Sequence, residues 1–182
     1  MSRCSWAIHS PLEEKYHDTE WGKPTHNERE LYEFLLLESM QAGLSWYTIL
    51  VKRQAFSDAF DQFDYQKIAT YGEEKVAELL GNAGIVRNRL KIRAAISNAQ
   101  AFMEVQKEFG SFDAYIWNFV ENTPITNPWQ TIEQVPAKTP LAEIISKDLK
   151  KRGFKFVGPT IVYSYMQAIG MVNDHLVTCA FK

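Results

Sequence analysis

Hydrophobic residues recur at helical spacing along nearly the whole chain, whereas alternating, strand-like stretches are scarce. In the stretch 28–40, steps of three and four, which mark one face of a helix, connect Leu31, Phe34, Leu35 and Glu38. The same spacing predicts further helices over residues 45–60, 64–72, 73–81, 88–106, 111–122, 139–152 and 158–170. The pattern therefore predicts an all-α fold.

The ends of these segments carry residue types that are typical of caps and turns. Ser45 is a suitable N-cap, Gly43 suits the turn before it, and Pro159 falls in a first helical turn, where proline is tolerated. The stretch 122–140 contains four of the seven prolines. We expect it to form a long surface connection.

The composition is that of a folded protein, with 46% hydrophobic and 13% aromatic residues among 182. This is enough apolar material for one compact domain over residues 1–182. The formal net charge of -2 excludes a broadly basic nucleic-acid binder, so any nucleic-acid surface must be local. No apolar run approaches the roughly 20 residues that span a bilayer, and charges near the start replace a signal peptide's apolar stretch. We therefore expect a cytoplasmic protein without membrane contact.

The two cysteines lie at opposite ends of the chain, each with a histidine nearby. His175 and Cys179 are four residues apart, so on a helix or tight turn both side chains point the same way. Cys4 and His17 are thirteen residues apart, which is the span of a loop. Together they would form a Cys2His2 zinc site that ties the N-terminal segment to the C-terminal one, with no position left for a catalytic water.

Two other interpretations of these residues stay open on spacing alone. The cysteines and histidines could be unrelated, since neither pair has the short C-x-x-C signature. A disulfide between the cysteines is a weaker alternative, because cytosolic thiols stay reduced. The remaining histidines, His9 and His26, are expected to be exposed.

The segment GFKFVG, residues 153–158, joins two predicted helices and has a glycine at each end. Glycines allow positive φ and leave N–H groups free to face an anion at the start of the next helix. The same region gathers five basic residues, Lys147, Lys150, Lys151, Arg152 and Lys155. We therefore favour sequence-independent contact with a phosphate backbone over a simple helix cap with a solvated face. For the similar stretch 82–96, with Gly84 before Arg87, Arg89, Lys91 and Arg93, neither interpretation is preferred.

An aromatic set accompanies one acidic residue, Glu38, and comprises Trp6, Tyr16, Trp21, Trp46 and Tyr47. We expect Trp21 to belong to the core. Glu38 shares a helix face with apolar residues, where a carboxylate must find hydrogen bonds or be costly to bury. It could read the donor edge of a base while rings stack on the base faces. Alternatively, it is structural and satisfied by a helix N-terminus or by Tyr16.

Four pieces, YHDTEWG, LESMQAGLSWYTIL, GFKFVGPT and VNDH, occur in this order between the two cysteines. Together they resemble the 3-methyladenine DNA glycosylase I family over nearly the whole chain. The resemblance implies a helix-hairpin-helix DNA glycosylase fold, with the motif over about residues 141–170. It also implies a structural zinc, one per chain, held by the residues matching Cys4, His17, His175 and Cys179.

The resemblance further implies roles at the site. Glu38 would contact the alkylated adenine, Trp46 would stack on it, and Tyr16 and Trp6 would help to close the pocket. Leu44 would be the wedge that fills the gap left in the duplex. The other expected DNA contacts are Gly43, Gly153, Lys155 and Gly158. Family members can carry an aromatic residue where Glu13 stands here, so that wall of the pocket would be more open or polar.

The expected reaction is removal of 3-methyladenine from double-stranded DNA. Methylation at N3 makes the base cationic, so the enzyme need not protonate the leaving group. It must extrude the nucleotide, at a cost of a few kcal/mol, and offer a negative, aromatic pocket. Water then attacks C1′, and without a lysine nucleophile an uncut abasic site remains. We expect Glu38 to be the catalytic residue of a monomeric enzyme.

Alternatives to this assignment concern both residue and function. Asp174 is the reserve candidate for the catalytic carboxylate, although it adjoins His175 and could instead orient that ligand. The protein could be a zinc-stabilised DNA-binding module without catalysis. It could also be a glycosylase for another lesion, such as 7-methylguanine or hypoxanthine.

Overall fold

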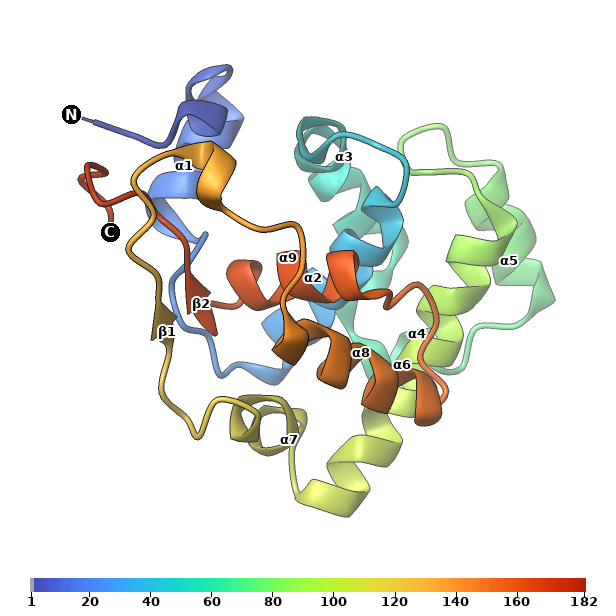
Figure 1. Cartoon of the computed structure of the whole chain (residues 1–182). Helices are drawn as coiled ribbons and strands as arrows, with labels where there is room; N and C mark the ends of the chain where they lie inside the picture. The colour runs from blue at the N-terminus through green and yellow to red at the C-terminus, as the bar shows by residue number, and fades with distance from the viewer. Residues whose placement is uncertain (1) are drawn as a thin grey trace.

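The computed structural model describes residues 2–182, most of them in helices (Figure 1). The α-helices are α1 (Pro11–Thr19), α2 (Glu28–Gln41), α3 (Trp46–Ala59), α4 (Tyr65–Ile68), α5 (Glu73–Leu80), α6 (Arg89–Phe109), α7 (Phe112–Asn118), α8 (Pro140–Lys151) and α9 (Pro159–Ala168). Short 3-10 turns are η1 (Ser5–Ile8), η2 (Asp61–Phe63) and η3 (Ile132–Gln134). No helix within residues 2–182 is long and apolar enough to cross a membrane.

The predicted caps explain where several helices begin. Ser45 caps α3, since its side chain accepts a hydrogen bond from the Thr48 amide, and Pro159 is in the first turn of α9. Helix α1 was not predicted from the sequence, although its start has a local signature. The Ser10 hydroxyl is the N-cap: it accepts a hydrogen bond from the Glu13 amide and also donates one to the Glu13 carboxylate. Glu13 is thereby engaged at a helix start.

The all-α prediction was wrong in one detail, a pair of two-residue parallel strands. Strand β1 (Ile125–Thr126) pairs with β2 (Val172–Asn173), and the Ile125 amide donates to the Met171 carbonyl at 2.8 Å. Two residues are too few for an alternating pattern to be visible in a sequence. The pair fixes the long connection after α7 against the C-terminal segment (Figure 1).

Helix α2 runs through the core, packed against α3, α6, α7 and α9. Every residue from 31 to 40 is buried, so this helix has no solvated face over ten residues. Such a helix is normally apolar all round. Glu33, Glu38 and Ser39 are therefore exceptional, and among the described residues no positively charged group pairs with Glu38.

The two ends of the described chain meet beside α1 (Figure 1). The Ala180 amide donates to the Ser2 carbonyl at 2.9 Å, and the Leu176 amide donates to the Cys4 sulfur at 3.4 Å. The Val177 amide also donates to the Trp129 carbonyl, so the connection before α8 joins the same region. This arrangement brings residues from both ends and the middle of the chain to one side of α2 and α9.

Candidate active site and metal cluster

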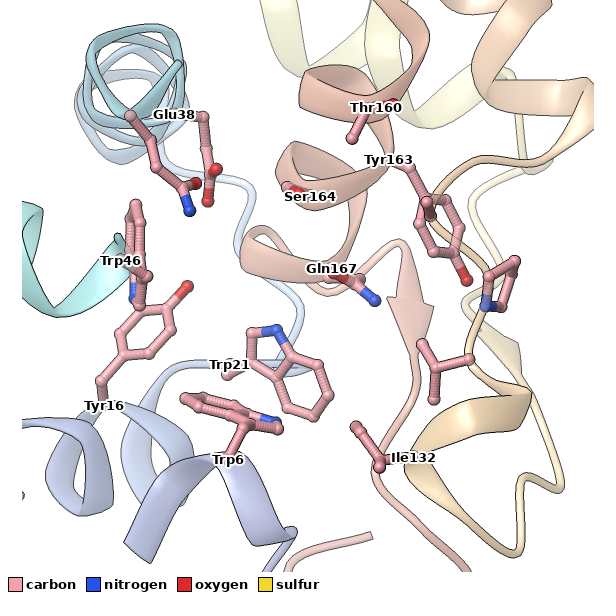
Figure 2. A pocket seen from close by; sticks show the side chains of 14 residues that line it. Trp6, Tyr16, Trp21, Glu38, Trp46, Ile132, Thr160, Tyr163, Ser164 and Gln167 are labelled. Atoms are coloured by element: carbon pink, nitrogen blue, oxygen red, sulfur yellow. The ribbon is translucent and has the colours of Figure 1, made fainter. Parts of the chain in front are cut away.

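A cavity of about 380 Å³ lies between α2, the start of α3, the N-terminal turns, α9 and the connection around η3. Figure 2 shows Trp46 and Tyr16 on one side, Tyr163 on the other, and Trp6 and Trp21 between them. Glu38 projects into it from the last turns of α2. The volume and the mixture of rings with a few polar groups suit a small planar ligand.

Two buried polar atoms of this cavity have no hydrogen-bond partner among the described residues, Glu38 Oε2 and Trp46 Nε1. A buried polar group without a partner costs about 1–3 kcal/mol, so folded proteins rarely retain one without a reason. Glu38 is only 3% exposed, and burial raises the pKa of its carboxyl to about 8. The cavity thus presents one acidic group and one N–H donor that a polar ligand could satisfy.

The rings form a continuous wall. Trp6 meets Trp21 edge-on with centroids 5.0 Å apart, and Tyr16 lies 5.2 Å from Trp46. Burial, and then the nearby Glu38 charge, raises the pKa of Tyr16, so its phenol stays neutral. Trp21 is buried as expected for core, but it also lines the cavity. An electron-rich wall of this kind attracts a cationic aromatic ligand.

Behind this wall, the four candidate metal ligands come together. The ligand atoms of Cys4, His17, His175 and Cys179 all lie within 4.8 Å of one another, and all four residues are buried. His17 Nε2 is 3.1 Å from His175 Nδ1, and Cys179 Sγ lies 3.5 and 3.4 Å from these two nitrogens. A tetrahedral ion with bonds of about 2.0–2.3 Å would separate its ligands by roughly 3.3–3.8 Å. The cluster could therefore hold one metal ion.

The surroundings of the histidines favour this use. The carbonyl of Trp21 lies 2.8 Å from His175 Nε2, and the Asp18 carboxylate lies 2.8 Å from His17 Nδ1. Both partners can only accept, so each ring carries its hydrogen on the outer nitrogen and directs a lone pair into the cluster. Burial lowers the pKa of His175 to about 4, which keeps that ring neutral. The unrelated-residue interpretation does not explain such a convergence.

Comparison with known proteins identifies the family. The model of the methyladenine glycosylase family matches residues 6–182. The chain belongs to this family. It is 46% identical over 179 residues to DNA-3-methyladenine glycosylase 1 of Escherichia coli K12, which covers 98% of this chain and 96% of that protein.

Solved structures of the glycosylase family have the same fold. A crystal structure of 3-methyladenine DNA glycosylase I superposes with a TM-score of 0.96 at 47% identity, covering 98% of each chain. The Staphylococcus aureus enzyme, whose structure addresses 3-methyladenine recognition, gives a TM-score of 0.96 at 35% identity over 100% of this chain and 97% of that one. The mostly helical fold is therefore that of the glycosylase family.

One wall of the glycosylase cavity was not predicted from the sequence. Ile132, Val135, Pro136 and Ala137 line it, and all come from the stretch expected to be only a surface connection. Gln41, Thr160, Tyr163, Ser164 and Gln167 complete the lining. The available signal was a pair of apolar residues, Ile132 and Val135, inside a polar, proline-rich loop. Which cavity they reach depends on long-range pairing with the C-terminal segment, which no local pattern encodes.

Asp174, the reserve candidate, is an anchor of this wall. It is 1% exposed, and its carboxylate accepts hydrogen bonds from the side chains of Asn127 (2.8 Å), Trp129 (2.8 Å), Gln167 (2.9 Å) and Tyr163. None of its hydrogen bonds within residues 2–182 reaches the ring of His175, which the Trp21 carbonyl orients instead. The alternative role of Asp174, orientation of the His175 ring, is therefore contradicted by this hydrogen bond.

The loop expected to enter DNA lies between α2 and α3. Gly43 has φ +78°, and open space surrounds it, while Leu44 is 40% exposed at the tip. Since Glu38 precedes this loop by one helical turn and Trp46 follows it, Leu44 stands next to the cavity residues in the chain.

The glycine-bounded loop 152–158 differs from expectation in two respects. Gly153 has φ +92°, but Gly158 has φ −61°, and Phe156 is the second residue with positive φ, at +54°. Arg152 is not free, because Glu108 and Asp148 bind its guanidinium at 2.7 and 2.8 Å. The side chain of Asn98 on α6 bonds the amide and carbonyl of Lys155. The exposed basic patch therefore consists of Lys147, Lys150, Lys151 and Lys155.

Proposed function

We propose that this chain is a DNA repair glycosylase that hydrolyses the N-glycosidic bond of 3-methyladenine in alkylated double-stranded DNA and leaves an abasic site. The observation that carries the proposal is the unpartnered, buried Glu38 carboxyl in a cavity walled by rings. The Escherichia coli relative is named for 3-methyladenine, and the Staphylococcus aureus structure concerns its recognition. The buried carboxyl and the aromatic wall of this chain support the same chemistry.

The charge of the substrate fits the chemistry of Glu38. In the nucleotide, 3-methyladenine is cationic, so a carboxylate beside it gains a charge-assisted hydrogen bond. The positive charge of the base also offsets the desolvation cost of the buried carboxylate. The amino group of adenine is a donor that Glu38 Oε2 accepts, while guanine offers a carbonyl at the same edge. Trp46 stacks on the base, and Tyr16 and Trp6 close the pocket. Stacking is worth about 1–3 kcal/mol per base, comparable to the cost of flipping.

Hydrolysis then needs little else from the protein. The methylated base leaves without protonation, and water attacks the sugar at C1′ as the bond lengthens. Glu38 stabilises the pocket-bound base and is the catalytic residue, while Asp174 holds the opposite wall. The cavity lining contains no lysine among the described residues, which supports a monofunctional reaction without strand cleavage.

DNA binds to the face that carries the loop between α2 and α3 and the loop between α8 and α9. Helices α8 and α9 with the loop between them act as a helix-hairpin-helix motif, in which Gly153 allows the turn, the Gly158 amide at the start of α9 faces a phosphate and Lys155 adds charge. Leu44 enters the duplex where the damaged nucleotide leaves, and Gly43 allows close approach of the backbone. The enzyme acts as a monomer.

The metal cluster holds one structural zinc. Two cysteines and two histidines fill a tetrahedral set, so no position is open for water and the ion takes no part in hydrolysis. Its function is to fix Trp6 and Trp21, whose rings pack directly on His17 and His175, with centroids 5.4 and 4.7 Å apart.

The direct test is incubation with DNA methylated by a radiolabelled methylating agent, followed by chromatography of the released bases. Release of 3-methyladenine, with intact strands until alkali is added, is expected. Absence of any released purine would leave a DNA-binding module, and predominant release of 7-methylguanine or hypoxanthine from suitable substrates would change the assigned lesion. The Glu38→Ala variant should lose excision while keeping affinity for an abasic-site duplex.

A further inference from the structure

Among the described residues one lysine is buried, and it lies in the first turn of α6. Lys91 is 7% exposed, although it stands among exposed basic residues at the start of this helix. Burial lowers the pKa of its amine. Lysines are almost never buried unless they are paired, so its contacts require an explanation.

The amine of Lys91 reaches across to the end of α2. Its Nζ donates to the carbonyls of Met40 at 2.9 Å and Ala42 at 2.6 Å. These are carbonyls that a helix C-terminus leaves without an intrahelical partner, and they carry the negative end of the helix dipole. A cation held there is stabilising, and here it also links α6 to the point where α2 stops.

The contacts fix the first residue of the DNA-facing loop. Ala42, with φ −46° and ψ 117°, turns the chain out of α2, and the following residues are Gly43 and the exposed Leu44. The Leu44 amide donates back to the Gln41 carbonyl at 2.6 Å. The Lys91 side chain therefore fixes the start of the loop between the two helices through the carbonyls of Met40 and Ala42.

We propose that Lys91 is a positioning residue, which holds the 42–45 turn so that Leu44 enters the duplex in register with the cavity. The inference rests on the proposed function, because it assumes that Leu44 acts on DNA. Lys91 itself touches neither base nor sugar. It should therefore affect steps that need the duplex and leave recognition of the free base unchanged.

The first experiment compares Lys91→Met with Lys107→Met. Methionine keeps most of the stem and removes the charge and the donors. Lys107 lies on the same helix, is exposed and pairs only with Glu104 in the described chain, so its variant is a matched control. Single-turnover release of 3-methyladenine from methylated duplex DNA should slow at least about tenfold for Lys91→Met, as expected for loss of hydrogen bonds to a charged donor, and stay unchanged for the control.

The second readout is affinity for free 3-methyladenine, measured by quenching of tryptophan fluorescence. It should be equal in the wild type and in Lys91→Met. Equal losses in base affinity and excision would mean that Lys91 is merely structural and would overturn the proposal. Lys91→Arg, which keeps the charge and donors, should recover part of the excision rate. If Lys91→Met does not fold, the same two measurements on Lys91→Arg decide the question. Slower excision with unchanged affinity for the free base supports the proposal, and equal losses in both overturn it.

A double-mutant cycle tests whether Lys91 acts through Leu44. In a Leu44→Ala background, Lys91→Met should slow excision no further, because the side chain it positions is absent. Additive effects would overturn the proposal. Failure of the wild type to release 3-methyladenine would reject the proposed function and this role together. Normal release by the wild type and by Lys91→Met would reject the role of Lys91 alone.

Discussion

Replacing Glu38 by glutamine should make the free protein more stable at neutral pH while it lowers activity. The carboxyl is 3% exposed, and its pKa is raised from 4.5 to about 8 by burial. Above pH 4.5 the unfolded chain loses this proton, while the folded chain keeps it up to about pH 8. The folded state therefore binds more protons across this window, and its free energy of unfolding falls as pH rises.

The magnitude follows from the width of the window. Each pH unit across it costs about 1.4 kcal/mol, so Glu38 should lower the stability at pH 7 by about 3 kcal/mol relative to a pH below 4.5. Glutamine has nearly the same shape but does not titrate. Glu38→Gln should remove this pH dependence and gain up to that amount at pH 7.

Denaturant unfolding of the wild type and Glu38→Gln at pH 5 and pH 7.5 measures the effect. Glu74→Gln, an exposed change on α5, is the control and should unfold as the wild type does at both values. Excision of 3-methyladenine by Glu38→Gln should fall by about 10- to 100-fold, the worth of a hydrogen bond to a charged group. A variant that keeps the wild-type pH dependence, or that is less stable at pH 7.5, would refute the reasoning.

Three further predictions concern pH, the loop and the metal cluster. Since a cationic base favours the ionised carboxylate, affinity for methylated duplex DNA should rise from pH 6 to about pH 8 in the wild type, and a titration of Glu38→Gln should show no such rise. Leu44→Ala should slow excision from duplex DNA about tenfold without changing affinity for the free base, and a matching loss in fluorescence-detected base binding would argue against a wedge. Cys179→Ser, or removal of metal by a chelator, should increase hydrogen exchange at both ends of the chain together, and unchanged exchange and melting would exclude a structural ion. Metal analysis of the wild type should give one zinc per chain.

The parts of the fold that were predicted correctly depend on short-range signals in the sequence, namely helix caps and apolar spacing. Ser45 and Pro159 mark helix starts because a cap acts within three or four residues. The apolar spacing in α2 likewise predicted that this helix has a buried face. The same logic would have found α1, which begins with Ser10 as its N-cap and has Glu13 three residues later. Interactions of this range are readable because both partners lie in one short piece of sequence.

Features that depend on distant pairing could not be predicted from residues alone. Asp174 bonds side chains up to 47 positions away, and the pairing of β1 with β2 carries Ile132 and Val135 to the cavity. Arg152 was expected to face DNA, yet its partner Glu108 is 44 positions away. Residue type and local spacing made the four metal ligands one of three open interpretations, and only the family pattern favoured it, since a separation of 171 residues between Cys4 and His175 has no physical signature.

The position of the metal cluster directly behind Trp6 and Trp21 has a consequence for biosynthesis. Those rings come from positions 6 and 21 and pack on His17 and His175, while the fourth ligand of the set, Cys179, lies far later in the sequence. A growing polypeptide on the ribosome therefore lacks a finished base-binding wall until residue 179 has emerged from the exit tunnel. Nascent fragments that lack Cys179 should therefore not bind alkylated purine.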